Sequence, residues 1–194
     1  MKEKKLFAIT GGIGSGKSAA LAALKDAGYS VLSSDEIVSE LYEKRKVKKL
    51  IRRLFPDAVT GVINLKLDRK KISALVFNDK EQLEKLTALI TPMVIEQIIK
   101  RFNKSDRSIF AEVPLLFERN YQDYFDEVIV VKRKLLDRVE SVIRRSKLSK
   151  DEVLARINAQ FDYDNSDLSK YIVISNDGDL NSLRSSVLEV TKNI

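Results

Sequence analysis

The 194-residue sequence contains no cysteine and no histidine. Without cysteine, the chain can form no disulfide and offers neither a thiolate nucleophile nor a thiolate metal ligand. Without histidine, it lacks the residue that most often serves as a general base or as a metal ligand. Acid–base chemistry must therefore fall to carboxylates, lysine or tyrosine.

Long apolar runs are also missing, and none approaches the roughly 20 residues that a membrane-spanning helix needs. The basic start, MKEKKLFAIT, lacks the long apolar stretch and small-residue cleavage site of a signal peptide. We therefore expect a cytoplasmic protein with no membrane partner. We expect it to be a monomer or a weak homo-oligomer.

What the chain does have is a globular composition, with 44% hydrophobic and 32% charged residues and a formal net charge of +7. The charge indicates an anionic partner, and the basic residues cluster at 44–53 and 131–147. These runs could be solvated helix faces or could bind nucleic acid. Since they carry no interleaved aromatic residues and no nucleic-acid reader motif, we expect phosphorylated small molecules rather than nucleic acid.

Short apolar segments alternate with amphipathic ones along the chain, which predicts an α/β fold with a five-stranded parallel sheet flanked by helices. The predicted strands are residues 5–10, 29–35, 108–117, 127–132 and 171–176. The predicted helices are residues 18–28, 35–54, 81–102, 135–145, 150–160 and 180–191.

Two helical stretches fall outside the simple alternation, at about 44–103 and about 135–168. In a nucleotide enzyme, such insertions would form an acceptor-binding region and a lid. The sequence thus predicts one domain whose core comprises about 1–43, 104–134 and 169–194.

The segment Gly11–Ser18, GGIGSGKS, satisfies the pattern G-x-x-x-x-G-K-[ST] between a predicted strand and a predicted helix. Glycines let successive backbone N–H groups approach phosphate oxygens, and the helix adds the positive end of its dipole. The lysine would reach the β- and γ-phosphates, and the serine hydroxyl would ligate Mg²⁺. We expect ATP to contact Gly12, Ile13, Gly14, Ser15, Gly16, Lys17, Ser18 and Ala19, with Ser18 as the metal ligand.

Asp35 follows the second predicted strand, at the sheet edge that also carries the glycine-rich loop. It could accept the proton of an attacking hydroxyl or hold Mg²⁺ through water. It could equally be an N-cap for the following helix. Because the chain has no histidine, a carboxylate is the best candidate for orienting an acceptor hydroxyl.

The P-loop fold serves many proteins, but the D-x-x-G and N-K-x-D motifs of GTPases are missing after the expected strands. The chain length and the lid-like insertion favour a small-molecule kinase. More specific segments are LDRKKISALVF (67–77), VPLLFE (113–118) and SNDGDLNSL (175–183), beside TGGIGSGKS (10–18) and SSDEI (33–37). Through them the sequence resembles the dephospho-coenzyme A kinase family nearly end to end.

The resemblance implies a P-loop NTPase fold and ATP- and Mg²⁺-dependent phosphorylation of the ribose 3′-hydroxyl of dephospho-coenzyme A. It implies that Asp35 is the catalytic carboxylate, with Lys17 on the phosphates, and that Arg69 helps to hold the acceptor. Arg145 would be a lid arginine that closes on the ATP phosphates, although both arginines could also be plain surface residues. The acceptor side would be lined by Pro114, Leu115, Leu116, Phe117 and Glu118.

The chain departs from the family pattern at several positions, which are Ala19, Ser33, Ser39, Thr91-Pro92, Ser141 and Ser169-Lys170. Ser141 stands where a second lid arginine is common, so Arg144 and Arg145 would have to serve instead. Two alternatives remain: a nucleoside- or nucleotide-type P-loop kinase with another acceptor, and a nucleotide-dependent regulator that binds nucleic acid.

Overall fold

The computed structural model describes residues 3–77, 79–146 and 148–192. The chain divides into two compact units. The first, here called the loop unit, comprises Met1–Ser33 and Phe102–Ile194, and the second, here called the helical unit, comprises Ser34–Arg101. Within the described residues, no helix combines the length and the apolar character that crossing a membrane requires.

The loop unit is built on a five-stranded sheet in the order β2-β5-β1-β6-β7, in which every neighbouring pair is parallel. This confirms the predicted α/β class and sheet. The strands are β1 (Leu6–Thr10), β2 (Ser30–Ser33), β5 (Ile109–Glu112), β6 (Glu127–Lys132) and β7 (Ile172–Ser175). The central β1 is buried at all five positions, as expected of an apolar strand covered on both sides.

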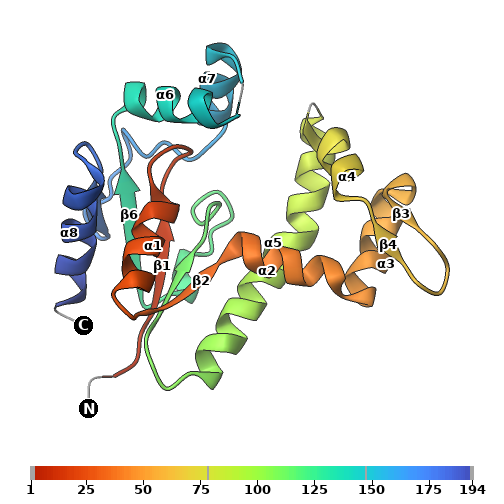
Figure 1. Ribbon diagram of the computed structural model, residues 1–194, viewed down its shortest axis with the longest axis horizontal. Helices are drawn as coiled ribbons and strands as arrows, with labels where there is room; N and C mark the ends of the chain where they lie inside the picture. The colour runs from red at the N-terminus through yellow and green to blue at the C-terminus, as the bar shows by residue number, and fades with distance from the viewer. Residues whose placement is uncertain (1–2, 78, 147, 193–194) are drawn as a thin grey trace. The chain divides into compact units, whose positions relative to one another are not determined.

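Helices α1 (Lys17–Asp26) and α8 (Leu180–Thr191) lie together beside the sheet (Figure 1). Helix α1 ends in a Schellman motif, with Gly28 at φ +87° and hydrogen bonds from Gly28 N to Lys25 O and from Tyr29 N to Leu24 O. The shared core comprises Phe7, Ile9, Ala20, Leu21, Leu24, Phe110, Ile129, Val131, Ile174, Leu183 and Val187. This packing fixes α1, and with it the loop that precedes α1.

Helices α6 (Leu135–Ser146) and α7 (Lys150–Asn158) form a second, smaller cluster in the same unit. A capping box begins α7: Ser149 Oγ accepts a bond from Glu152 N, and Glu152 Oε2 accepts one from Ser149 N. The short 3₁₀ helix η2 (Gln122–Tyr124) precedes β6.

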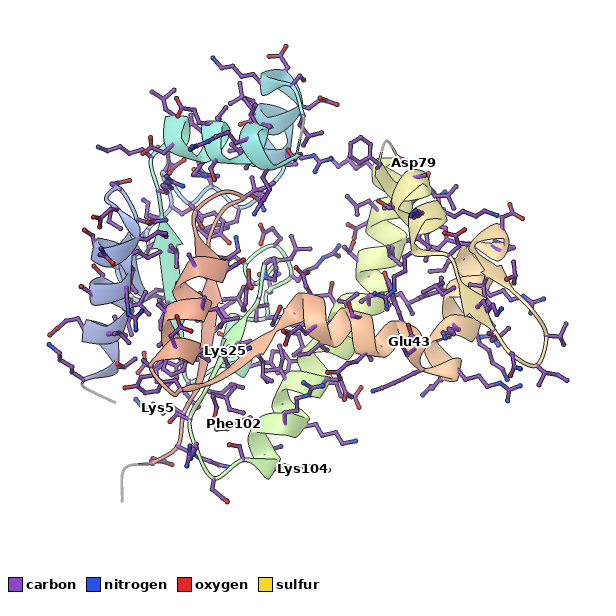
Figure 2. The ribbon with its side chains drawn as sticks, viewed as in Figure 1. Lys5, Lys25, Glu43, Asp79, Phe102 and Lys104 are labelled. Atoms are coloured by element: carbon purple, nitrogen blue, oxygen red, sulfur yellow. The ribbon has the colours of Figure 1, made fainter. Side chains whose placement is uncertain are left out.

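The helical unit consists of α2 (Ser34–Glu43), α3 (Arg45–Leu54), η1 (Pro56–Ala58), β3 (Val59–Thr60), β4 (Lys66–Leu67), α4 (Arg69–Phe77) and most of α5 (Lys80–Lys104). Figure 2 labels Glu43 at the end of α2 and Asp79 before the start of α5. Asp79 Oδ1 accepts hydrogen bonds from the N–H groups of Glu81 and Gln82, so it caps α5.

Several predicted boundaries were wrong. The helix expected over 35–54 is two helices, because the chain turns at Lys44. The strand expected over 108–117 ends at Glu112, and residues 114–120 form turns. The strand expected over 29–35 ends at Ser33. Asp35 is therefore the second residue of α2 rather than the end of a strand or the residue before a helix.

Candidate active site

The glycine-rich loop joins β1 to α1 in the loop unit, as its sequence predicts. Helix α1 begins at Lys17, one residue earlier than expected, and Gly16 at φ +103° is its N-cap. That left-handed conformation suits glycine and would strain another residue. The N–H groups of the first helical turn have no partner within the helix, so they form a ready anion-binding end.

The loop glycines also make room for the protein's own side chains. A Cβ atom added at Gly12 would lie 2.3 Å from Arg138 Nη2, and one at Gly16 would lie 2.2 Å from Asn176 Nδ2. The sequence predicts that these glycines let phosphate oxygens approach the backbone. The structure adds that Arg138 and Asn176 occupy the space that side chains at these positions would fill.

Lys17 lies over this loop, where its Nζ donates hydrogen bonds to the carbonyl oxygens of Gly11 at 2.7 Å and Gly12 at 3.0 Å. The pKa of Lys17 is lowered to about 8, mainly by burial, and the nearby positive charges of Arg138 and Arg145 contribute to this lowering. Glu112 opposes them. The amine is thus a poorly solvated cation close to two other cations. A bound polyphosphate would stabilise this arrangement, because its negative charge would offset the repulsion between them.

Ser18 is the second residue of α1, and its Oγ donates a hydrogen bond to Glu112 Oε1 at 3.2 Å. Glu112 is the last residue of β5, beside β1 in the sheet. Sequence reasoning missed Glu112 because it expected the strand to run on to Phe117. The available signal was an acidic residue within an otherwise apolar strand. The next predicted contact, Ala19, is half-buried and packs against the core beneath the loop.

The segment Pro114–Glu118 forms the turn after β5. Leu116 is fully buried and Phe117 nearly so, and the Phe117 ring contacts the rings of Phe161, Tyr163 and Tyr171. Glu118 Oε1 accepts a hydrogen bond from Phe161 N at 3.1 Å. In this structure, therefore, Leu116 and Phe117 serve the core of the loop unit, whereas Pro114, Leu115 and Glu118 are half-buried.

Arg145 lies in the last turn of α6 and is exposed. The same helix carries Arg138, which sequence reasoning overlooked and which is 3% exposed. Its Nε donates a hydrogen bond to Ile13 O at 3.1 Å. No feature of the sequence distinguishes Arg138 from the other basic residues of this amphipathic helix.

The other two predicted residues, Asp35 and Arg69, belong to the helical unit. Asp35 is exposed in the first turn of α2. Arg69, the first residue of α4, donates hydrogen bonds to Ser39 Oγ and O at 3.3 and 3.1 Å, and its Nη2 lies 3.0 Å from Glu43 Oε1. Arg69 is thus fixed to α2, the helix whose first turn holds Asp35.

Known proteins resemble this chain over nearly its full length. A profile of the dephospho-CoA kinase family matches residues 5–182. A Thermus thermophilus protein named dephospho-CoA kinase is 35% identical over 190 residues, which cover 97% of this chain and 91% of that protein. A Fusobacterium nucleatum protein of the same name is 32% identical over 179 residues, covering 92% of each chain.

Solved structures also resemble this chain over nearly its full length. A Thermus thermophilus crystal structure has a TM-score of 0.80 and 34% identity, with 100% of this chain and 99% of that chain covered. The dephospho-CoA kinase from Campylobacter jejuni has a TM-score of 0.69 and 25% identity, with 98% and 97% covered. A phosphate loop, an acid beside its serine and end-to-end similarity of sequence and structure lead to one conclusion: the chain belongs to the dephospho-CoA kinase family.

Proposed function

We propose that this chain transfers the γ-phosphoryl group of ATP to the ribose 3′-hydroxyl of dephospho-coenzyme A and so produces coenzyme A. The observation that carries the proposal is the geometry of residues 11–18 in a member of this family. The Lys17 ammonium lies over the loop, and the Ser18 hydroxyl faces a carboxylate. These groups suit a bound triphosphate and its metal ion.

The donor atoms at Ser18 and Glu112 fit a magnesium ion. A hydroxyl and a carboxylate are hard oxygen ligands, and Mg²⁺ usually takes one or two such protein groups and fills its other positions with phosphate oxygens and water. Among the described residues, no three histidine, cysteine, aspartate or glutamate side chains are grouped so that they could hold a metal ion by themselves. When bound, the metal would neutralise charge on the phosphates. Ser18 would bind it directly, and Glu112 would act directly or through water.

The loop amides and Lys17 would hold the β- and γ-phosphates in line with the acceptor. Arg145 would add a positive charge beside the transferring group. Its position supports this role, because it is one of the cations close enough to lower the pKa of Lys17. As part of the α6–α7 segment, which we propose to be the lid, Arg145 would also help to exclude water.

In the helical unit, Asp35 would accept a hydrogen bond from the ribose 3′-hydroxyl and take its proton as the new bond to phosphorus forms. Arg69 would hold the negatively charged acceptor, and its contacts with Ser39 and Glu43 keep its guanidinium in place. The unit carries the basic helix α3, whose sequence RKVKKLIRRL includes no acidic residue. That helix supplies further positive charge for an anionic acceptor.

The test is to incubate the purified protein with ATP, Mg²⁺ and dephospho-coenzyme A. We expect ADP and an acceptor that gains one phosphate on its ribose 3′-oxygen, identified by mass and by chromatography against coenzyme A. Adenosine and AMP serve as comparison acceptors in the same coupled assay. If adenosine or AMP were turned over faster than dephospho-coenzyme A, the proposed acceptor would be wrong. ATP binding with no turnover of any acceptor would contradict the kinase assignment.

A further inference from the structure

Ile13, in the middle of the glycine-rich loop, is held at three points by the segment that runs from α6 to residue 164. Its side chain packs against the α6–α7 cluster, whose buried members are Val139, Val142, Leu148 and Val153. Its backbone N–H donates a hydrogen bond to Gln160 Oε1 at 2.7 Å. Its carbonyl oxygen accepts one from Arg138 Nε at 3.1 Å.

Arg138 joins Ile13 to the side chain of Asp164, which lies in the segment after α7. Its Nη1 donates to Asp164 Oδ2 at 3.2 Å, so one planar guanidinium bridges Ile13 and Asp164. The Arg138 side chain is 4% exposed, whereas that of Asp164 is 46% exposed. A buried guanidinium is strongly destabilising unless it is paired and hydrogen-bonded. The bond to Ile13 satisfies the Nε donor, and the ion pair with Asp164 gives the charge a partner of opposite sign.

The same guanidinium restricts the shape of the loop. It lies against Gly12, and the backbone of α6 runs so close to Gly14 that an added Cβ would lie 2.7 Å from Arg138 O. Gly12, Ile13 and Gly14 are therefore all in contact with Arg138 or its backbone.

We propose that Arg138 is a positioning residue for the phosphate loop. The bridge from Ile13 through Arg138 to Asp164 holds the loop backbone in the conformation that binds the triphosphate, and it makes nucleotide binding depend on the docking of α6. This inference rests on the proposed function, because it assigns Arg138 a part in ATP binding at that site. It needs no particular acceptor.

The experiment measures the Kd of ATP–Mg²⁺ by calorimetry, without acceptor, for the parent and four variants. We expect Arg138→Met to weaken binding at least about 10-fold, because a charged hydrogen bond and the loop's support are both lost. Arg138→Lys should weaken it by a similar factor, since a lysine keeps the charge but cannot bridge two acceptors as a planar fork does. Asp164→Ala should weaken it about 3-fold or more. Lys150→Met, which removes an exposed charge from α7, should leave Kd within about twofold.

Two results with the Arg138 variants would overturn the proposal. One is an Arg138→Met affinity within twofold of the parent, and the other is full rescue by Arg138→Lys, which would mean that charge alone matters. A merely destabilised fold would lower the number of binding sites in the titration without changing Kd. If Arg138→Met does not fold, Asp164→Ala decides, because it removes only a half-exposed carboxylate, and an unchanged affinity there refutes the bridge. Because the titration contains no acceptor, its result does not depend on the acceptor's identity. If dephospho-coenzyme A were not turned over, the proposed acceptor would be wrong, but the comparison of ATP affinities among the variants would still test the role of Arg138.

Discussion

The side-chain amide of Asn176 donates a hydrogen bond to the backbone carbonyl oxygen of Ser15 at 2.8 Å, joining residues 161 positions apart. Asn176 is buried directly after β7, and its own N–H donates to Lys132 O at 2.8 Å. The end of the sheet thus fixes the side chain that supports the loop. The conformation of the phosphate loop depends on residues near the C-terminus as well as on its own glycines.

We expect Gly16→Ala to damage nucleotide binding strongly. The new Cβ would lie 2.2 Å from Asn176 Nδ2, and the backbone at φ +103° is unfavourable for alanine. Loss of stability of about 2–3 kcal/mol and an ATP affinity at least about 10-fold weaker should follow. Chemical denaturation and an ATP titration measure the two effects.

Gly28→Ala is the matched control, because Gly28 also has a positive φ, of +87°, but an added Cβ there would meet nothing within 4 Å. It should cost about 1–2 kcal/mol of stability from backbone strain alone and leave the ATP Kd unchanged. Equal losses of affinity in the two variants would mean that Gly16 acts through general stability rather than through the loop.

The sheet could be predicted from the sequence because buried parallel strands appear as short apolar runs. The strand at 127–132 and the helix at 180–191 have the predicted ends. The break at Lys44 could not be predicted, because the break contains no glycine or proline. The pair β3–β4 has two residues in each strand, too few to show periodicity.

The candidate site also has residues that could be predicted from the sequence and residues that could not. The loop, Lys17 and Ser18 could be predicted because their spacing is local. Glu112, Arg138, Gln160 and Asn176 act on the loop from 94 to 161 residues away in the chain. Their roles depend on tertiary contacts, and one polar residue on an amphipathic segment looks like any other in the sequence alone.

We expect Glu112→Gln to raise the Mg²⁺ concentration needed for half-maximal activity by about 10-fold, because the metal would lose the charge of a carboxylate that lies 3.2 Å from Ser18 Oγ. A magnesium titration of the kinase assay at saturating ATP measures this. Glu127→Gln is the control, since Glu127 begins β6 and pairs with Lys5. An unchanged magnesium requirement in Glu112→Gln would remove Glu112 from the proposed metal site.

We expect kcat/KM for ATP to fall as the pH rises above about 8, the value to which burial lowers the pKa of Lys17. The free enzyme then loses the cation that holds the phosphates, and kcat/KM reports free-enzyme pKa values. In the nucleotide complex the phosphates would raise this pKa, so kcat should decline only at higher pH. A kcat/KM profile that stays level to pH 10 would contradict the assignment.

The same shift predicts a stability change of definite sign in the ligand-free protein. Between pH 8 and the unfolded value of 10.5, the unfolded chain binds more protons at Lys17 than the folded protein does. Stability from this group therefore rises with pH across that window. The stability of the parent minus that of Lys17→Met isolates the effect, and this difference should increase from pH 8 to 10.5. A constant or falling difference would show that the Lys17 pKa is not lowered.

Asp35→Asn tests the carboxylate that would orient the acceptor. We expect kcat to fall by about 10²- to 10⁴-fold with little change in KM for ATP, because asparagine keeps the shape of the side chain but cannot take the 3′-hydroxyl proton. Steady-state kinetics with dephospho-coenzyme A measures both constants.

The control for this prediction is Glu36→Gln, because both acids lie exposed in the first turn of α2. Each carboxylate interacts with the positive end of the helix, so either substitution should cost about 0.3–1 kcal/mol of stability. The two variants therefore match in their effect on the helix and differ in their proposed chemistry. If both lowered kcat equally, Asp35 would be a helix-stabilising acid rather than the base. A large loss confined to Asp35→Asn would assign the proton transfer to that carboxylate, in a chain that has no histidine to serve as the base.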